Sequence, residues 1–352
     1  MDDRLMWATT YMGPQNLSFR QVPIPEIGSE DMLVRVRVAL TCGTDVKTYR
    51  RGHPKYTPPT LFGHEFAGDV VAVGSGVQGF APGMRVVSGN TAPCNECYYC
   101  KRGQHNLCED LLVNLGAYAE YIRIPGRLVR QNTFELPAHV SYQQAAISEP
   151  LACVIHGQDL LQIQAGESVA ILGAGGPIGL MHVQLALRRG ATPVIAVDIN
   201  AARLEVARSL GATHVIDSTH QDPVQAVREL TGGRGADVVI ECAGVKSTWL
   251  AALDVVRKGG RVEWFGGLPE GTQLEVNAGR VHYDEIAIFG VYHLTPLSLE
   301  RAFRMICSGT VNVDALITHR VPLSELERGL RLMMEGQSIK VAVVPDAVMA
   351  ER

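Results

Sequence analysis

The sequence predicts an α/β fold: a doubly wound parallel sheet with helices on both faces, together with a second domain that carries a metal-binding lobe. Two observations lead to this prediction. Between residues 156 and 293, short apolar runs alternate with segments of helical period, the pattern of a parallel sheet with crossover helices. Outside that region, four cysteines fall within the sixteen residues 93–108, close enough to bind one metal ion. A chain of 352 residues also exceeds one ordinary core, so two domains are expected.

The predicted parallel sheet has six strands. Each candidate is a short run of mostly branched apolar residues, as expected of strands that are buried on both faces. The runs are SVAIL (168–172), VIAVD (194–198), THVID (213–217), ADVVIECAG (236–244), GRVEWFGG (260–267) and EIAIFGVYH (285–293). Helical segments follow the first three, namely GLMHVQLALRR (179–189), RLEVARSLGA (203–212) and PVQAVRELTGG (223–233).

The first strand, the glycine-rich turn after it and the next helix predict a dinucleotide site of the Rossmann type. Glycines let the backbone approach a pyrophosphate, whose charge is stabilised by the N-terminus of the helix. Asp198 ends the second strand, where its carboxylate can bind ribose hydroxyls and repel a 2′-phosphate. This pattern favours NAD over NADP. Arg203 either stacks on the adenine or lies on the helix surface.

Composition argues against several classes of protein. The net charge of −4, the pI of about 6.3 and the lack of a basic patch argue against a nucleic-acid partner. The N-terminus begins with acidic residues and has no apolar run, unlike a signal peptide. The most apolar stretch, SVAILGAGGPIGL, is interrupted by four glycines and a proline and is too short for a membrane span. We therefore expect a cytoplasmic protein, whose thiols stay reduced.

The four clustered cysteines have the spacing C-x2-C-x2-C-x7-C. They are Cys94, Cys97, Cys100 and Cys108. In a reducing compartment disulfides are disfavoured, which leaves a metal ion, an iron–sulfur cluster or unliganded core thiols. Proline, which follows the last cysteine of a common iron–sulfur pattern, is absent here. Four thiolates on one zinc ion leave no open position, so such a site is structural.

A second group of ligands lies upstream, in TCGTDV (41–46) and FGHEFAG (62–68). Cys42, His64 and Glu65 offer a thiolate, an imidazole and a carboxylate. Three protein ligands leave one position for water or substrate, which is the arrangement of a catalytic zinc. The alternative is that the cysteine and the histidine are merely buried.

In order and spacing, these motifs resemble the zinc-dependent medium-chain dehydrogenases, which include alcohol, polyol and threonine dehydrogenases. The resemblance rests on CGTD, GHE and the four-cysteine lobe, and continues through GAYAEY (116–121), EPLACVIHG (149–157), GAGGPIGL (173–180), VIECAG (239–244) and ITHRVPL (317–323). It implies a mostly β, GroES-like catalytic domain formed by residues 1–155 and 294–352, and a Rossmann NAD-binding domain at 156–293. It also implies that the four cysteines hold a structural zinc.

The resemblance also assigns roles to residues of the catalytic site. Cys42, His64 and either Glu65 or Glu149 would hold the catalytic zinc, although Glu149 also reads as a capped turn before Pro150. Thr44 would contact the reacting oxygen. Lys47 stands where many family members have histidine, and would relay protons, contact a phosphate or lie at the surface.

For the cofactor and the substrate, the resemblance implies two further sets of contacts. The cofactor would lie against Gly173, Gly175, Gly176, Pro177, Ile178, Gly179, Asp198, Arg203, Cys242 and Ala243. The turn has one glycine more than the family's GAGPIG, which leaves open which glycine has which role. His293, together with Thr44 and Glu149, would contact the substrate, or His293 simply ends a strand.

The implied activity is the reversible, zinc- and NAD-dependent oxidation of a secondary alcohol to a ketone. A polyol or sugar is the expected substrate, but the arginine of animal sorbitol dehydrogenases is missing from Tyr292-His293-Leu294. L-Threonine 3-dehydrogenase, a cyclic polyol or amino-polyol dehydrogenase and a sugar-phosphate dehydrogenase remain open, as does a non-catalytic nucleotide-binding relative. The resemblance also implies a homo-oligomer, a dimer or a tetramer, that pairs through an edge strand near 285–293.

Overall fold

The computed structural model describes residues 5–54 and 56–350. The chain forms two compact units, which are described separately. The first unit contains the described residues up to Ala152 and those from Leu294 onward, and the second unit is Cys153–His293. The boundary between them falls inside helix α4 (Ser148–Leu161).

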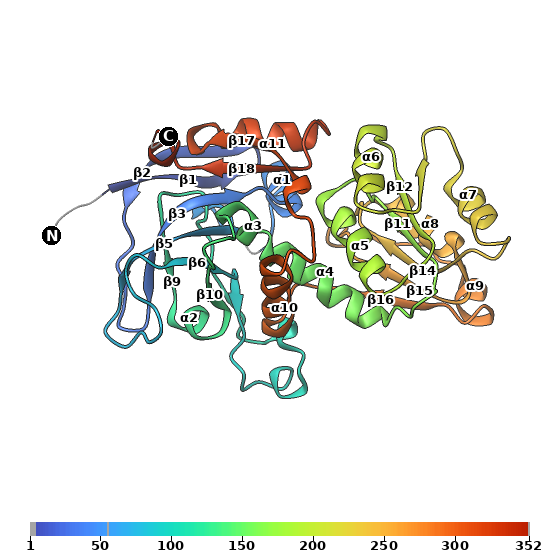
Figure 1. Ribbon diagram of the computed structural model, residues 1–352, viewed down its shortest axis with the longest axis horizontal. Helices are drawn as coiled ribbons and strands as arrows, with labels where there is room; N and C mark the ends of the chain where they lie inside the picture. The colour runs from blue at the N-terminus through green and yellow to red at the C-terminus, as the bar shows by residue number, and fades with distance from the viewer. Residues whose placement is uncertain (1–4, 55, 351–352) are drawn as a thin grey trace. The chain divides into compact units, whose positions relative to one another are not determined.

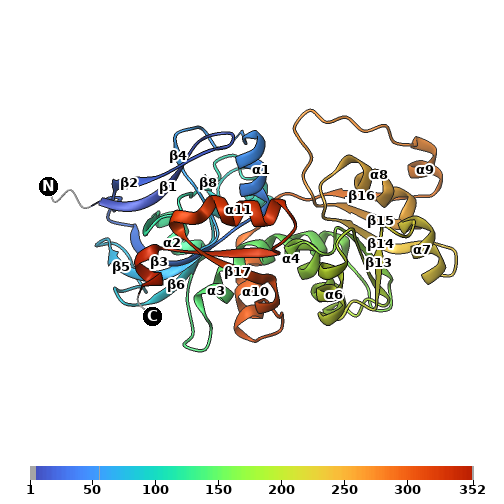
Figure 2. The same ribbon diagram turned by 90° about the horizontal axis from the view of Figure 1, so that it is seen from above.

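The second unit is built on a six-stranded parallel sheet with the order β13-β12-β11-β14-β15-β16. Its strands are β11 (Val169–Leu172), β12 (Val194–Asp198), β13 (His214–Asp217), β14 (Ala236–Glu241), β15 (Val256–Trp264) and β16 (Ala287–Gly290). Its helices besides α4 are α5 (Pro177–Arg188), α6 (Ala201–Ser209), α7 (Pro223–Leu230), α8 (Lys246–Val255) and α9 (Ala278–Tyr283). Helices lie on both faces of the sheet in Figures 1 and 2.

This order makes the sheet doubly wound, as the sequence predicts. The chain starts at β11, moves outward to β13, and returns to place β14 on the other side of β11. Helix α5 packs against α6, and α7 packs against α8. The apolar side chains of β11 are buried along its whole length, which explains why the run lacks polar alternation. The order of the strands reverses between β11 and β14, the position where such sheets bind their ligands.

The first unit is mostly β. Its strands are β1 (Leu5–Gly13), β2 (Asn16–Pro23), β3 (Met32–Leu40), β4 (Thr60–Leu61), β5 (Phe66–Val73), β6 (Arg85–Ser88), β7 (Thr91–Ala92), β8 (Leu112–Val113), β9 (Tyr121–Ile124), β10 (Thr133–Glu135), β17 (Ile317–Pro322) and β18 (Lys340–Val344). Its helices besides α4 are α1 (Gly43–Arg51), α2 (Gly126–Asn132), α3 (Tyr142–Ala146), α10 (Pro296–Cys307), α11 (Leu326–Met334) and α12 (Asp346–Met349).

The main sheet of the first unit joins distant parts of the chain. Its order is β10-β6-β5-β3-β18-β17, and β9 also pairs with β3. Strand β3 alternates buried and half-buried residues over most of its length, as expected of a strand with only one face in the core. Strand β18 is antiparallel to β3 and parallel to β17. This pairing brings Lys340 next to the segment that follows β3.

In the part of the chain that the structure describes, no helix has both the length and the apolar character that a membrane crossing requires.

Candidate metal and cofactor sites

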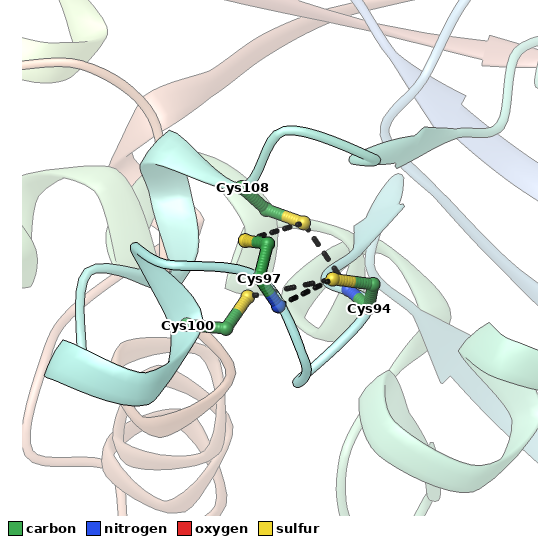
Figure 3. A group of neighbouring side chains, drawn as sticks. All are labelled: Cys94, Cys97, Cys100 and Cys108. Carbon is green, nitrogen blue, oxygen red and sulfur yellow. Dashed lines mark hydrogen bonds between the residues drawn. The ribbon is translucent and has the colours of Figure 1, made fainter.

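Four cysteine side chains converge in a lobe of the first unit, residues 93–113 (Figure 3). Cys94 and Cys97 follow β7, Cys100 begins the 3-10 helix η1 (Cys100–Arg102), and Cys108 follows η2 (His105–Leu107). Their sulfur atoms all lie within 4.8 Å of one another. Two of the distances, Cys94 Sγ to Cys100 Sγ and Cys97 Sγ to Cys108 Sγ, are both 4.0 Å.

These distances fit one tetrahedral zinc ion. Zn–S bonds of about 2.3 Å place thiolates about 3.8 Å apart at the corners of a tetrahedron. An iron–sulfur cluster fits less well, because several irons would lie between its cysteines. No disulfide joins any of the eight cysteines, all of which lie in the described residues. Backbone N–H groups of Cys100 and Glu109 lower the pKa of Cys97 to about 6, which favours the thiolate that a metal needs.

Cys42, His64 and Glu65 form a second group, with one ligand atom of each within 4.8 Å of the others. Cys42 is the N-cap of α1, and its Sγ accepts a hydrogen bond from Thr44 N at 3.4 Å. His64 and Glu65 lie between β4 and β5. Gly63 before them has a φ of +88°, and a Cβ there would lie 2.6 Å from the Tyr118 ring, so glycine is needed at this turn. A thiolate, an imidazole and a carboxylate suit a zinc ion with an open position.

Asp45 contacts the imidazole ring of His64 on its Nδ1 side. Its Oδ1 lies 3.3 Å from His64 Nδ1, while its Oδ2 accepts hydrogen bonds from Cys42 N at 2.9 Å and Tyr118 Oη at 2.6 Å. With Nδ1 facing this carboxylate and the Tyr56 hydroxyl at 3.4 Å, Nε2 is left for a metal, as in carboxylate–histidine–zinc arrangements. Burial lowers the pKa of His64, but Tyr56 and Asp45 raise it more.

Glu65 makes a buried ion pair with Lys340, which comes from β18. Lys340 Nζ lies 2.5 Å from Glu65 Oε2 and donates a second hydrogen bond to the Thr41 carbonyl at 2.7 Å. Both side chains are almost fully buried. Burial lowers the pKa of Lys340, but the charges of Glu65, Cys42 and Glu149 and the hydrogen bond to Glu65 together raise it more, so the lysine is charged. The other oxygen, Glu65 Oε1, is buried without a hydrogen-bond partner among the described residues, as expected of an atom reserved for a metal.

The other predicted catalytic residues lie around this group. Glu149, in the first turn of α4, is buried, and burial raises its pKa to about 7 while His64 opposes the shift. The charges of His64 and Glu65 thus both affect the pKa of Glu149. The group whose ligand atoms lie within 4.8 Å of one another, Cys42, His64 and Glu65, nevertheless does not include Glu149. Thr44 and Lys47 both lie on α1 and are half-buried. Lys47 is thus less solvated than an ordinary surface lysine.

In the second unit, the four glycines of the turn after β11 differ in what surrounds them. Gly173 follows β11 with a φ of +79°, and a Cβ there would lie 2.7 Å from Ala243 N. Gly179 packs closely as well, because its Cβ would lie 2.5 Å from the Gly173 carbonyl oxygen. At Gly176, the N-cap of α5, a Cβ would meet only that carbonyl oxygen, at 3.6 Å. The space before the helix is therefore open to a phosphate, and Pro177 and Ile178 begin the helix behind it.

The remaining glycine, Gly175, contacts the acid at the end of β12. Gly175 N donates to Asp198 Oδ2 at 2.8 Å, and Asp198 Oδ1 accepts from the backbone N–H groups of Ile199 and Asn200 at 2.8 and 3.0 Å. A Cβ at Gly175 would lie 2.9 Å from Asp198 Oδ2 and 2.7 Å from Arg203 Cβ. The additional glycine thus lets the turn approach Asp198 and Arg203, and Arg203 is half-buried rather than fully exposed.

The last predicted residues of the second unit lie in different settings. Cys242 N donates to the Leu172 carbonyl at 2.8 Å, and burial raises the pKa of its thiol. Ala243 lies against Gly173. The strand that was expected over 285–293 is shorter, because β16 is Ala287–Gly290. His293 therefore does not end a strand; it lies beyond β16 with a left-handed φ of 63°.

Sequence reasoning missed the residues that support the ligands. Asp45, Tyr118, Tyr56 and Lys340 were not predicted as site residues, although the first two lie in the motifs CGTD and GAYAEY. Asp45 carries a usable signal, since it stands at the third helical position of α1 and completes a capping box with Cys42. Lys340 carries no local signal.

Two family profiles match the chain. The profile of the alcohol dehydrogenase GroES-like domain matches residues 28–134, and that of the zinc-binding dehydrogenase matches residues 177–308. Among curated relatives, the chain is 35% identical to L-threonine 3-dehydrogenase of Bacillus licheniformis, covering 98% of this chain and 100% of the relative. It is 32% identical to sorbitol dehydrogenase of Bacillus subtilis, with coverage of 97% and 98%.

A solved structure agrees with this family assignment. A Sinorhizobium meliloti protein, solved with NADP bound, superimposes with a TM-score of 0.90 at 36% identity, covering 97% of this chain and 100% of the other.

Proposed function

Since the chain belongs to the zinc-dependent medium-chain dehydrogenases and is a zinc- and nicotinamide-dependent alcohol dehydrogenase, we propose that it oxidises a secondary alcohol of a polyol or sugar-type substrate to a ketone with NAD. The observation that carries the proposal is the convergence of Cys42, His64 and Glu65 within 4.8 Å, with a buried, unpartnered carboxylate oxygen. These three residues would hold the catalytic zinc, and Cys94, Cys97, Cys100 and Cys108 the structural zinc. When bound, the catalytic ion supplies a Lewis acid that polarises the alcohol oxygen and lowers its pKa.

The residues around the ligands have distinct tasks in this proposal. Asp45 orients His64 and keeps Nε2 directed at the ion. Lys340 balances the charge of Glu65 and fixes its carboxylate. The Thr44 hydroxyl accepts the proton of the alcohol and passes it toward solvent, and Glu149 is an alternative carboxylate ligand. Lys47 is assigned to the proton path, and His293 to a substrate hydroxyl.

For the cofactor, the proposal is NAD in preference to NADP. When bound, NAD would supply the hydride acceptor for the alcohol carbon. Three backbone N–H groups hold the Asp198 carboxylate at the end of β12, where it would bind ribose hydroxyls and repel a 2′-phosphate. Gly173, Gly176 and Gly179 would let the pyrophosphate approach α5, and Pro177, Ile178, Arg203, Cys242 and Ala243 would line the rest. The NADP in the Sinorhizobium meliloti structure makes this preference worth measuring.

Asp198→Ala tests the cofactor preference. We expect kcat/KM for NAD to fall by about tenfold, the loss of one charge-assisted hydrogen bond, and kcat/KM for NADP to rise. Glu205→Ala, on the exposed side of α6, is the control. An unchanged ratio of the two constants would show that another group holds the ribose.

A second candidate substrate is L-threonine, favoured by the 35% identity to the Bacillus licheniformis L-threonine 3-dehydrogenase. Threonine, like a polyol, has a secondary alcohol whose neighbouring carbon carries a polar group. The experiment is NADH formation by zinc-loaded protein with sugar alcohols, inositols, amino-inositols, sugar phosphates and L-threonine. The substrate with the highest turnover would identify the chain as a polyol or a threonine dehydrogenase. Cys42→Ser should abolish turnover of that substrate while leaving NAD binding intact. No turnover across the panel, with zinc and NAD bound, would count against the polyol and threonine proposals and favour an alcohol substrate outside the panel.

We further propose that the protein is a homo-oligomer, a dimer or a tetramer, that pairs through β16. This strand lies at one edge of the parallel sheet, and an exposed edge offers unpaired backbone groups to a second copy. Sedimentation equilibrium tests the proposal, and a monomer at micromolar concentration would contradict it.

The cytoplasm is the proposed compartment. The four-thiolate site requires reduced cysteines, and a reducing compartment keeps them so. Cell fractionation tests the assignment.

A further inference from the structure

Tyr118 lies beside the candidate zinc ligands without being one of them. It belongs to the segment GAYAEY (116–121), ahead of β9, and its side chain is almost fully buried. Its Oη donates to Asp45 Oδ2 at 2.6 Å and also lies 3.0 Å from the Leu40 carbonyl oxygen. The hydroxyl has one hydrogen, and a charged carboxylate is the stronger acceptor. The distance to Asp45 also falls within the range of about 2.5–2.7 Å for a hydroxyl that donates to a carboxylate.

The carboxylate that Tyr118 contacts is shared between two of the candidate ligands. Asp45 Oδ2 also accepts from the Cys42 backbone N–H at 2.9 Å, and Asp45 Oδ1 lies 3.3 Å from His64 Nδ1. Because two donors hold Oδ2, the carboxylate cannot rotate without breaking both hydrogen bonds, and Oδ1 stays directed at the imidazole. The orientation of His64 therefore depends on the hydroxyl of Tyr118.

The same segment also holds the turn that leads into His64. Backbone N–H groups of residues 116–118 donate three hydrogen bonds to the carbonyls of residues 62 and 63, at 2.9 to 3.1 Å. The Tyr118 ring packs so closely on this turn that a Cβ at Gly63 would lie 2.6 Å from it. A phenylalanine would keep the ring and the backbone hydrogen bonds. The part that only tyrosine supplies is the hydroxyl that holds the carboxylate.

We propose that Tyr118 is a positioning residue of the metal site, whose hydroxyl fixes Asp45 and, through it, the ligands Cys42 and His64. The inference rests on the proposed function, which assigns these ligands to the catalytic zinc. Burial and the charge of Asp45 raise the pKa of Tyr118 well above its usual value, so the hydroxyl keeps its proton and remains a donor.

Tyr118→Phe tests the hydroxyl alone. The zinc-loaded full chain is titrated with a chelator of known zinc affinity, and the ion that Cys42→Ser lacks identifies the zinc held at this site. Groups that orient a metal-bound histidine change metal affinity by about 10- to 100-fold when they are removed. Since Tyr118 acts through Asp45, we expect Tyr118→Phe to weaken this zinc by about tenfold.

Tyr49→Phe is the matched control. Tyr49 lies on the same helix as Asp45, α1, and its Oη donates to Glu327 Oε1 of α11 at 2.7 Å. The control therefore loses a hydrogen bond of the same kind without touching Asp45, and it should keep the zinc affinity of the parent chain. Both variants should retain the zinc of the four-cysteine lobe, which shows that the first unit is folded.

Two further measurements separate positioning from a general loss of stability. With cobalt(II) in place of zinc, the visible absorption depends on the geometry of the ligands, and the parent spectrum minus that of Cys42→Ser isolates this site. The bands should shift in Tyr118→Phe and stay unchanged in Tyr49→Phe. In a double-mutant cycle, Tyr118→Phe should weaken zinc binding much less when Asp45→Asn is already present, because the two residues act as one unit.

Unchanged zinc affinity and cobalt bands in Tyr118→Phe would overturn the inference and leave the proposed metal site standing. Losses of affinity that simply add in the cycle with Asp45→Asn would overturn the route through that carboxylate. If Cys42→Ser binds as much zinc as the parent chain, the assignment of the ligands is wrong, and the proposed function fails together with the inference.

Discussion

At the scale of single residues, the group formed by Cys42, His64 and Glu65 contains a charge that is paired out of contact with water. Glu65 and Lys340 are buried together, and Lys340 Nζ also donates to the Thr41 carbonyl. Removing one member of a buried ion pair leaves the other charge uncompensated, which costs about 3–5 kcal/mol. We therefore expect Lys340→Met to lower the free energy of unfolding of the first unit by about this amount, measured by urea denaturation followed by circular dichroism.

The matched control is Lys258→Met. Lys258 lies 2.9 Å from Asp284, but its side chain is 80% exposed, so its loss should cost less than about 1 kcal/mol. Lys340→Met should also weaken zinc binding at Cys42, His64 and Glu65, since the orientation of Glu65 depends on it. If Lys340→Met and Lys258→Met unfold at the same urea concentration, the buried pair does not stabilise the site.

The three residues that the structure brings together as candidate ligands could be named from the sequence, but the residues that support them could not. Cys42, His64 and Glu65 stand in short motifs whose residue types already suggest a metal. Lys340 lies 275 residues from Glu65, and only the pairing of β18 with β3 brings the two together. No local spacing encodes such a contact. For the same reason, the sequence leaves open whether Glu65 or Glu149 is the carboxylate ligand. The distance of Glu149 from His64 depends on the three-dimensional position of α4, which no local pattern states.

At the scale of elements, we expect the four-cysteine lobe to depend on a bound zinc ion more than on hydrogen bonding. The regular structure of the lobe consists of two three-residue 3-10 helices and the two-residue strand β8, which pairs with β7 just before the lobe. Such a segment gains most of its order from a structural zinc. We expect Cys100→Ser to lower the zinc content from about two ions per chain to about one, and to make Lys101 and Arg102 accessible to trypsin. Metal analysis and limited proteolysis measure both effects.

Cys307→Ser serves as the control for the lobe, because Cys307 is half-buried at the end of α10. It should keep both ions and resist trypsin. Cys42→Ser should lose the other zinc and leave the lobe uncut. Retention of two ions by Cys100→Ser would contradict the assignment of the lobe.

Elements of the parallel sheet were easier to predict than those of the first unit. The six apolar runs became β11 to β16, and the inner strands β11, β12 and β14 are buried along nearly their whole length, as an unbroken apolar run predicts. The edge strands β13 and β16 are partly exposed. Their ends shifted where turns intervened, as at β16, which stops at Gly290. The strands of the first unit pair mainly antiparallel across long stretches of sequence, and nothing in a local pattern states which strand is the partner.

At the scale of the whole molecule, two buried ionisable residues of the second unit make stability depend on pH. Glu263 on β15 is fully buried, with neither carboxylate oxygen hydrogen-bonded among the described residues. Burial raises its pKa to about 8. His182 on α5 is also fully buried, and burial lowers its pKa to about 3. The unfolded chain returns both groups to their ordinary values, so folding is coupled to protons in opposite directions.

The sign of each effect follows from which state binds more protons. Between about pH 3 and 6.5 the unfolded chain protonates His182 and the folded chain does not, so stability rises with pH. Between about pH 4.5 and 8 the folded chain keeps Glu263 protonated and the unfolded chain does not, so stability falls with pH. The two windows overlap between about pH 4.5 and 6.5, where the opposite slopes offset each other, so the combined contribution of the two groups is greatest there. Glu263→Gln, which is neutral at every pH, should remove the alkaline fall.

We expect Glu263→Gln to raise the melting temperature at pH 8 by at least about 5 °C relative to the parent chain, and to change it little at pH 5, where the parent carboxyl is already protonated in the folded state. Scanning calorimetry across this range measures the effect. Glu275→Gln, at an exposed position, should leave the profile unchanged. If the melting temperatures of Glu263→Gln and of the parent chain depend on pH in the same way, water or a cation reaches the Glu263 carboxylate.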